Sequence, residues 1–371
     1  MFLQYFHSQP LIKLILQLLM VKKQNIRHWT KEQLTDFFKT HGEQAFRAKQ
    51  VYEWLWKKHA TTFDEMTNLS SKTRALLNEH FVINAIATIE EQVSADRTIK
   101  NAFKLHDGNI VEGVLIPTPK RMTACISSQV GCSLTCAFCA TGKLDRLRNI
   151  EADEIFDQVA FIKKQAETKY HTPLTNIVYM GMGEPLLNYK NVLASIEKIT
   201  DAEGLGMSPK RITVSTAGIA KMIKKLGDDE VKFNLALSLH AANDEKRSKI
   251  MPINEQNSLE VLKEAFVYFY EKTGSRVTFE YIIFKDFNDS LEDARELAAF
   301  CKTVPCKINI IEYNPIDDAE FEKADTKKTD DFARFLEEKY HLIVNVRRSR
   351  GKDIDAACGQ LANKNKGVAK R

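Results

Sequence analysis

Three closely spaced cysteines are the residues best suited to chemistry in this chain. Cys132, Cys136 and Cys139 form a C-x3-C-x2-C cluster in the stretch CISSQVGCSLTCAFCATG, residues 125–142. A structural zinc site closes its coordination with four protein ligands, and most cubane iron–sulfur clusters take four thiolates. No fourth cysteine or histidine follows at a comparable spacing. Three protein ligands would leave one metal corner open, which suits a site where another molecule must bind.

Two plainer interpretations of the cysteine cluster stay open at this level. The three residues could form a zinc loop that a distant ligand completes, or they could be unrelated buried cysteines. The chain has seven cysteines, three of them in the cluster, which favours a reducing compartment over a disulfide scaffold. We therefore expect a cytoplasmic protein.

The composition is that of an ordinary soluble globular protein. Its 371 residues have room for one large catalytic domain and a smaller one, and 44% of them are hydrophobic. A net charge of +5 permits a nucleic-acid partner without requiring one. Residues 1–26 are expected to be an extension whose start is not the native one. Its apolar part, 11–20, is about half of a membrane span, so no membrane role is predicted.

Residues 27–85 have helical periodicity and are expected to form a small domain. Thr30 can cap the first helix, and a second helix follows the break at Gly42. Basic residues alternate with aromatic ones around the second helix; they are Arg47, Lys49, Lys57 and Lys58 with Phe46, Trp54 and Trp56. This pattern is compatible with RNA binding through phosphates and stacked bases, although composition alone favours a plain helical bundle with solvated lysines.

Residues 86–120 have a β pattern and predict a short connector. Strand and helix patterns then alternate over 121–350, which predicts parallel βα units in a partial (β/α)6 barrel, an α/β fold. The expected strands are 123–127, 176–180, 211–215, 233–239, 277–284 and 308–313. The expected helices are 151–168, 189–201, 217–225, 258–272 and 290–303. A helix over 328–339 and a strand over 342–346 precede a tail, 351–371.

Small and polar residues follow the expected strands. In parallel βα folds the carboxyl ends of the strands meet at one rim, where ligands bind. The segments at these ends are the cysteine loop, MGMGEPLLN with Glu184, STAG from Ser215, SLH from Ser238 and YNP from Tyr313. Each alone is usually structural. Because polar segments follow several strands that end at the same rim, together they predict a binding site there.

Together with the tail motif RSRGKDIDAACGQL, these motifs resemble the radical S-adenosylmethionine (SAM) enzymes that methylate C2 of adenine in 23S ribosomal RNA and tRNA, the RlmN family. The resemblance covers residues 27–361, including FRAKQVYEWLW and MTNLS of the helical domain. It implies a radical-SAM barrel in which Cys132, Cys136 and Cys139 hold a [4Fe–4S] cluster. The SAM contacts that it implies are Gly183, Glu184, Ser215, Ser238, Leu239, His240 and Asn314.

The resemblance also implies roles for two further cysteines and one carboxylate. Cys358 matches the family's methyl-carrying cysteine, and Cys125 matches the partner that later forms a transient disulfide with it. Glu112 matches the proposed proton acceptor. The implied reaction is ping-pong: Cys358 takes a methyl group from one SAM, and a second SAM starts the radical step that transfers the carbon to adenine C2.

Further expectations follow from the resemblance. The partners are 23S ribosomal RNA, a tRNA, and a low-potential electron donor such as a flavodoxin, while the enzyme itself is expected to be a monomer. A flipped or loop nucleotide is expected, and basic residues near the rim favour phosphate contacts. Those residues are Lys143, Arg146, Arg148, Lys210, Arg211, Arg347, Arg348, Arg350 and Lys352. Methylation at adenine C8, and a non-catalytic RNA-binding module that carries a metal cluster, stay open as alternatives.

Overall fold

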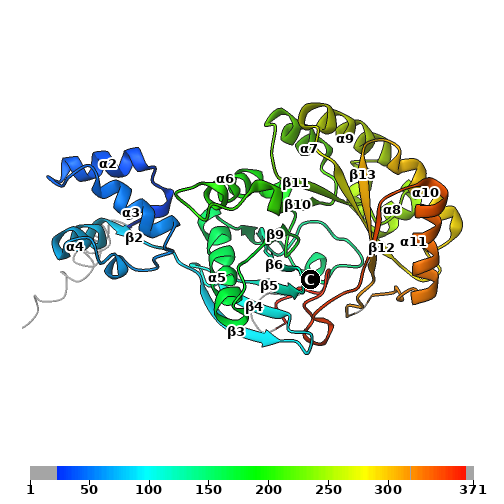
Figure 1. The fold of residues 1–371 in the computed structure, drawn as a ribbon, viewed down its shortest axis with the longest axis horizontal. Helices are drawn as coiled ribbons and strands as arrows, with labels where there is room; N and C mark the ends of the chain where they lie inside the picture. Colours follow the sequence, from blue (N-terminus) through cyan, green and yellow to red (C-terminus); the bar gives the residue numbers. More distant parts are fainter. Residues whose placement is uncertain (1–22, 318, 365–371) are drawn as a thin grey trace, which may run out of the picture. The chain divides into compact units, whose positions relative to one another are not determined.

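A computed structural model describes residues 23–317 and 319–364 of the chain. Most of the expected N-terminal extension and the last seven residues lie outside the described residues. The chain divides into two compact units between Asn84 and Ala85 (Figure 1). Each unit is described by itself below.

The first unit is a small helical domain. Its helices are α2 (Lys31–Thr40), α3 (Arg47–Trp56) and α4 (Ser71–His80), and a parallel strand pair, β1 (Gln24–Asn25) and β2 (Phe81–Val82), joins its two ends. Thr30 caps α2 in a capping box with Gln33, as the sequence predicts, and Ser70 caps α4.

The aromatic residues of the first unit divide between its core and its surface. Trp56 is 2% exposed and packs inside, which matches the plain-bundle interpretation. Phe46, in contrast, is 55% exposed, with the Arg47 guanidinium 4.9 Å from its ring centroid. Lys58 lies 4.0 Å from the ring centroid of Trp54. Part of the basic and aromatic pattern is thus a surface feature that a nucleic acid could reach.

The second unit is built on one ten-stranded sheet. Its parallel part runs through seven strands in the order β6–β9–β10–β11–β12–β13–β14. Their bounds are β6 Arg121–Cys125, β9 Asn176–Tyr179, β10 Ile212–Thr216, β11 Asn234–Ser238, β12 Val277–Ile283, β13 Cys306–Glu312 and β14 Val344–Arg347. The six expected strands are all present, and the strand expected near 342–346 joins them as a seventh. The predicted partial α/β barrel is confirmed.

Helices follow the parallel strands and cover the outer face of the sheet (Figure 1). They are α5 (Ala152–Tyr170), α6 (Tyr189–Thr200), α7 (Ala220–Asp228), α8 (Asp244–Ile250), α9 (Leu259–Thr273), α10 (Leu291–Cys301) and α11 (Thr326–Tyr340). The helix α8 is not among the expected helices, because its seven residues, DEKRSKI, are too few to show a helical period.

The expected β connector continues this sheet. β3 (Ala87–Val93), β4 (Ile99–Lys104) and β5 (Ile110–Thr118) pair antiparallel with one another, and β5 pairs with β6. The tail then returns to these strands, since Asp353 accepts hydrogen bonds from Ser94 and Ala95. The C-terminal end of the described chain is therefore fixed beside the start of the sheet.

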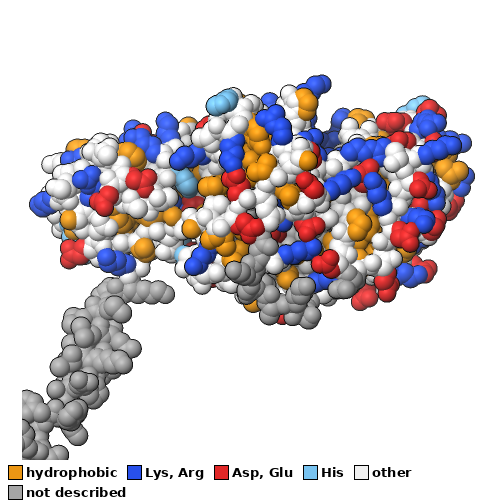
Figure 2. All heavy atoms as spheres, turned by 90° about the horizontal axis from the view of Figure 1, so that it is seen from below, with side chains coloured by type: hydrophobic (Ala, Val, Ile, Leu, Met, Phe, Trp, Pro, Cys, Tyr) orange, Lys and Arg blue, Asp and Glu red, His pale blue; other side chains and the backbone are white. Residues whose placement is uncertain are grey.

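Two surface properties bear on possible partners. In the face shown in Figure 2, lysine and arginine side chains are interspersed with aspartate and glutamate rather than gathered in one field. Within residues 23–317 and 319–364, no helix has both the length and the apolar character that a membrane span needs.

Candidate active site

The cysteine loop begins where β6 ends. A short antiparallel pair, β7 (Gln129–Val130) with β8 (Arg148–Asn149), closes the loop at its base. Gly131 lets the backbone of the loop pass close to Asp145, because it has a φ of 73° and a Cβ there would lie 1.9 Å from the Asp145 carbonyl oxygen. The loop is thus a tight excursion at the carboxyl end of the first parallel strand.

All three loop cysteines line one cavity of about 600 Å³. Cys125 and Cys358, which lie far apart in the sequence, line the same cavity. Gly183, Glu184, Ser215, Ser238 and His240 also line it. Leu239 and Asn314 adjoin it through their neighbours, whereas Glu112 is not among its lining residues.

The donor set fits an iron–sulfur cluster. Burial raises the pKa of the Cys136 thiol, and the neighbouring Cys139 and Cys132 raise it further. Three adjacent thiols, one buried and two half-buried, can ionise together only if a cation shares their charge. Soft thiolates select zinc or iron–sulfur centres, and this loop offers three of them. We infer that the loop can hold a cubane cluster with one iron left for a ligand that is not protein.

The segment after β9 positions the Glu184 carboxylate in the same cavity as the cysteine loop. Gly183 has a φ of 92°, and a Cβ there would lie 2.4 Å from the Gln129 side chain. Glu184 follows, 3% exposed, and accepts hydrogen bonds from the backbone N–H groups of Ala217 at 2.7 Å and Leu186 at 2.9 Å. Burial raises the pKa of Glu184 to about 7, although these amides oppose the rise. The carboxylate is fixed in place and could receive a cationic group.

The ends of β10, β11 and β13 supply the remaining expected contacts. The Ser215 and Ser238 hydroxyls lie 3.4 Å apart. His240 has a φ of 55°, and its Nδ1 accepts the backbone N–H of Ile282 at 3.0 Å. Asn314 donates to the Cys358 carbonyl oxygen at 3.3 Å. Side chains from separate strands therefore meet at the rim where the sequence places them.

His240 gives a prediction about pH. Burial and the charge of Arg247 lower its pKa to about 3, so folded His240 stays neutral where an unfolded histidine becomes protonated. Between these pKa values the unfolded chain binds the extra proton, and stability falls as the pH falls. The wild type should lose about 2 kcal/mol more unfolding free energy than a His240→Gln variant between pH 7 and pH 5. Urea unfolding of both proteins at each pH measures this, and equal losses would contradict it.

Arg247, on α8, connects several segments of the rim through hydrogen bonds. It is not among the residues that the sequence predicts for the site. It is fully buried, and it donates to the carbonyl oxygens of Ala217 at 2.6 Å and Leu239 at 3.1 Å, and to Asn254 Oδ1 at 2.7 Å. Burial lowers its pKa to about 10, so it remains a cation at neutral pH. A lone arginine in a charged segment gives no sequence signal of burial.

Replacing Arg247 by leucine should cost about 3–5 kcal/mol of folding stability, because several buried oxygen acceptors lose their donor at once. Thermal or urea unfolding measures the loss. Arg295→Leu is the matched control, since Arg295 is about half exposed, pairs with the exposed Glu292 and lies 6.0 Å from the ring centroid of Phe335. Equal stability losses in the two variants would contradict the role given to Arg247.

Cys358 and Cys125 line the same cavity, but their thiols differ in exposure and in pKa. Cys358 is exposed to the cavity, yet the enclosing walls raise the pKa of its thiol, while Arg347 lowers it. Cys125 is 7% exposed, and burial together with the charge of a Cys358 thiolate raises its pKa. Cys358 is thus the thiol that is easier to ionise and to reach.

Backbone contacts fix the segment that carries Cys358. The Ala140 N–H of the cysteine loop donates to the Gly359 carbonyl oxygen at 2.7 Å, and Thr141 Oγ1 donates to the Leu361 carbonyl oxygen at 2.6 Å. Glu112 accepts the N–H groups of Ala362 and Asn363 and forms an ion pair with Lys100. In this arrangement the Glu112 carboxylate holds the tail.

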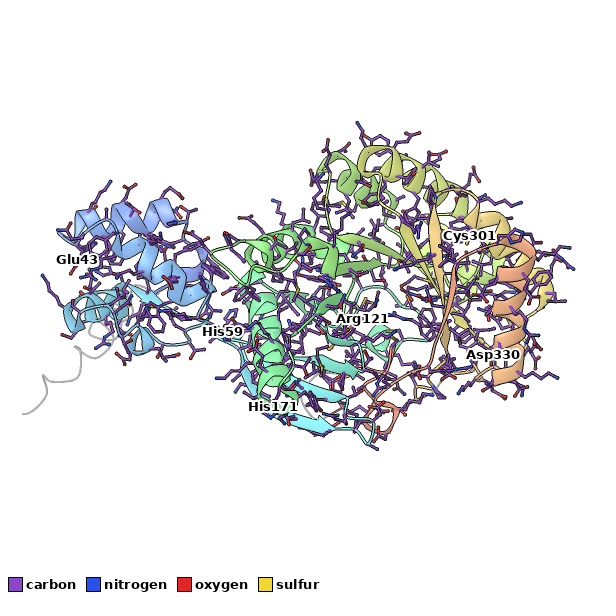
Figure 3. All side chains as sticks on the ribbon, in the orientation of Figure 1. Glu43, His59, Arg121, His171, Cys301 and Asp330 are labelled. Carbon is purple, nitrogen blue, oxygen red and sulfur yellow. The ribbon has the colours of Figure 1, made fainter. Side chains whose placement is uncertain are left out.

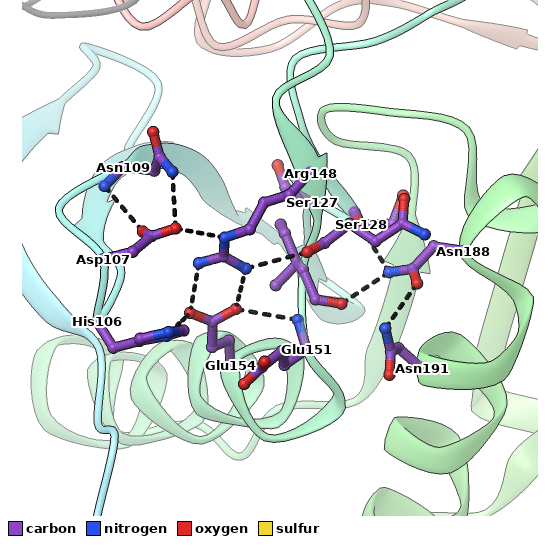
Figure 4. Close-up of polar contacts among 12 residues, drawn as sticks. His106, Asp107, Asn109, Ser127, Ser128, Arg148, Glu151, Glu154, Asn188 and Asn191 are labelled. Atoms are coloured by element: carbon purple, nitrogen blue, oxygen red, sulfur yellow. Dashed lines mark hydrogen bonds and ion pairs between the residues drawn. The ribbon is translucent and has the colours of Figure 1, made fainter. Parts of the chain in front are cut away.

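Several expected phosphate contacts are engaged inside the protein. Figure 4 shows the Arg148 guanidinium bonded to both oxygens of Glu154 and to Asp107. Arg348 and Lys352 both pair with Glu312. Two carboxylates neutralise the charge of Arg148, which disfavours a phosphate contact by this residue; the contact stays a prediction. Lys120, Arg121 and Arg347 are exposed and line the cavity, and Arg348 and Arg350 line it as well.

The remaining two cysteines lie elsewhere. Cys301, labelled in Figure 3, ends α10 and is 3% exposed. Cys306 starts β13, and its thiol contacts the Cys301 carbonyl oxygen at 3.4 Å. Neither lines the cavity.

Comparisons with known proteins agree with this site. Residues 126–299 match the radical SAM superfamily, and residues 24–83 match the ribosomal RNA large subunit methyltransferase N-terminal domain. A solved radical SAM methyltransferase from Sphaerobacter thermophilus superimposes with a TM-score of 0.86 at 36% identity, covering 91% of this chain and 99% of that one. The fold and the thiol site thus define a radical SAM methyltransferase.

Close relatives narrow the class further. A protein of Cytophaga hutchinsonii named probable dual-specificity RNA methyltransferase RlmN is 64% identical over 93% of this chain and 94% of its own length. A protein of Christiangramia forsetii with the same name is 60% identical over 92% and 97%. The chain belongs to the RlmN family, and the resemblance noted in its motifs is confirmed.

Proposed function

We propose that this enzyme methylates C2 of an adenine in RNA, and that its substrates are 23S ribosomal RNA and a tRNA. The observation that carries the proposal is the meeting of five cysteines at one cavity, three on a metal-binding loop and two apart from it. The names of the relatives support RNA as the substrate. The exposed Phe46 with Arg47, and Trp54 with Lys58, offer a stacking and phosphate surface on the first unit.

Cys132, Cys136 and Cys139 would hold the [4Fe–4S] cluster. Gly183 and Glu184 would receive the amino-acid part of SAM, and the other contacts would orient its ribose and sulfonium; they are Ser215, Ser238, Leu239, His240 and Asn314. When bound, the cluster and SAM supply one-electron chemistry and a methyl group. A low-potential protein such as a flavodoxin would donate the electron.

The two cavity cysteines would carry the carbon in a ping-pong reaction that uses two SAM molecules per turnover. Cys358, as the thiolate, takes a methyl group by displacement, aided by the nearby Arg347 charge. The methyl group would then give a hydrogen atom to the radical that the second SAM supplies, and its carbon would bond to C2 of adenine, with the one excess electron passing back to the metal centre. Glu112 accepts the C2 proton, for which it must release the tail amides that it now holds. Cys125 attacks the Cys358 sulfur, so the product leaves and a disulfide forms, which an external thiol reduces.

A direct test combines the reconstituted enzyme, SAM, a reductant and a ribosomal RNA fragment. Nucleoside mass spectrometry of the digested RNA should show 2-methyladenosine. The appearance of 8-methyladenosine instead would favour the C8 alternative. No methylation in the presence of an intact cluster would overturn the proposal and favour a binding module.

A further inference from the structure

One buried carboxylate in the cavity has no part in the reaction derived above. Glu280 lies in the middle of β12, lines the cavity and is 4% exposed. Its Oε1 accepts a hydrogen bond from Asn309 Nδ2 at 2.7 Å. Its Oε2 is buried and has no hydrogen-bond partner among the described residues. The nearest cation, Arg347, is 3.9 Å away, beyond hydrogen-bond reach. A buried acceptor left unpaired is costly and is expected to have a partner in the working state.

The neighbouring strands fix which oxygen stays unpaired. Ser238, Glu280, Asn309 and Asn345 are register partners in a row across β11 to β14. Asn345 Nδ2 donates to Asn309 Oδ1 at 3.4 Å, so the amide of Asn309 turns its own Nδ2 toward Glu280. This orientation assigns Oε1 to Asn309 and leaves Oε2 free for a ligand.

The position of Glu280 points to the substrate. Glu280 and Arg347 line the same cavity as Cys358, and they have opposite effects on the pKa of its thiol, which carries the methyl group in the proposed reaction. Exposed cations, Lys120, Arg121 and Arg347, line the same cavity and could receive phosphates. A base that enters past these cations and stops beside Cys358 would lie next to Glu280.

We propose that Glu280 determines specificity for adenine, with Oε2 accepting a hydrogen bond from the 6-amino group of the target base. This inference rests on the proposed function. A carboxylate offers acceptors only, and the 6-amino group is the exocyclic donor of adenine. That group and C2 flank N1 on the same edge of adenine, so the amino group can bind Glu280 while C2 lies beside Cys358, which lines the same cavity. A base with a 6-carbonyl group would instead place its carbonyl oxygen against Glu280 Oε2, and two hydrogen-bond acceptors repel each other.

The test measures kcat/KM for RNAs that carry adenosine, purine riboside or inosine at the target position. Purine riboside lacks the 6-amino group, so the wild type should prefer adenosine by about 10–100-fold, the value of one hydrogen bond to a charged group. Glu280→Ala should remove most of this preference. In Glu280→Gln the amide oxygen stays with Asn309 and the NH2 group faces the base, so the preference should shift toward inosine.

Glu312→Gln is the matched control. Glu312 is 5% exposed and does not itself line the cavity, although its partner Arg348 does. It is a buried carboxylate that is already paired, with Arg348 and Lys352, so its loss should affect all three RNAs equally. An unchanged adenosine preference in Glu280→Ala would overturn the proposal. If Glu280→Ala also loses the methylation of Cys358 by SAM in the absence of RNA, as measured by protein mass spectrometry, Glu280 would be assigned to SAM binding. That result would overturn the proposal as well. A wild type that methylates no adenosine RNA would instead refute the proposed function.

Discussion

Replacing Cys358 by alanine is expected to abolish RNA methylation completely. In the proposed reaction every transferred carbon passes through this sulfur, and no other exposed thiol lines the cavity in the described part of the chain. The protein should still fold, because the tail around Cys358 is held by backbone and side-chain contacts of other residues. Methyl transfer from labelled SAM to RNA measures the loss.

Cys306→Ala is the control for this variant. Cys306 is half-buried at the start of β13, away from the cavity, so its removal should leave methylation near the wild-type level. A Cys358→Ala enzyme that still methylates RNA would mean that the carbon takes a route without a protein carrier.

Replacing Cys136 by alanine is expected to remove the metal centre and all activity with it. The three cysteines line one cavity, and burial together with the two neighbouring thiols raises the pKa of Cys136. Two thiolates are too few to hold a cubane cluster. Anaerobically purified wild type should show a broad absorbance band at roughly 400 nm, and the variant should lack both this band and its iron.

The same Cys306→Ala variant controls for the general loss of a thiol and should keep the band. A colourless wild-type protein that binds zinc instead would contradict the assignment of the site. An iron content in Cys136→Ala equal to that of the wild type would show that other ligands hold the metal.

Much of the fold could be predicted from local patterns. The alternation of apolar strands with amphipathic helices predicts the parallel sheet, and each expected strand is found within a few residues of its position. Gly183 and Glu184 could be placed at a strand end, because a glycine that must approach another segment leaves a local mark in the sequence. Such features depend on neighbours in the chain.

Contacts between distant segments left no such mark. Arg247 appears in a charged run typical of a surface helix, yet it is fully buried under the rim. Glu280 is a single acidic residue in a strand, where an exposed face is the usual explanation, and its burial depends on β11 and β13, the strands on either side of β12. Arg148 follows the cysteine loop like a phosphate contact, but Asp107 and Glu154 arrive from other segments to bind it.

The central claim is that Cys125 and Cys358 act in sequence on one carbon, and a Cys125→Ala variant tests it most directly. Without Cys125 nothing attacks the Cys358 sulfur after the carbon has bonded to adenine. The account predicts a covalent adduct between RNA and protein that accumulates with SAM and reductant, linked through Cys358 and visible by mass spectrometry of nuclease- and protease-digested protein. Methylated RNA released at the wild-type rate without any adduct would contradict it.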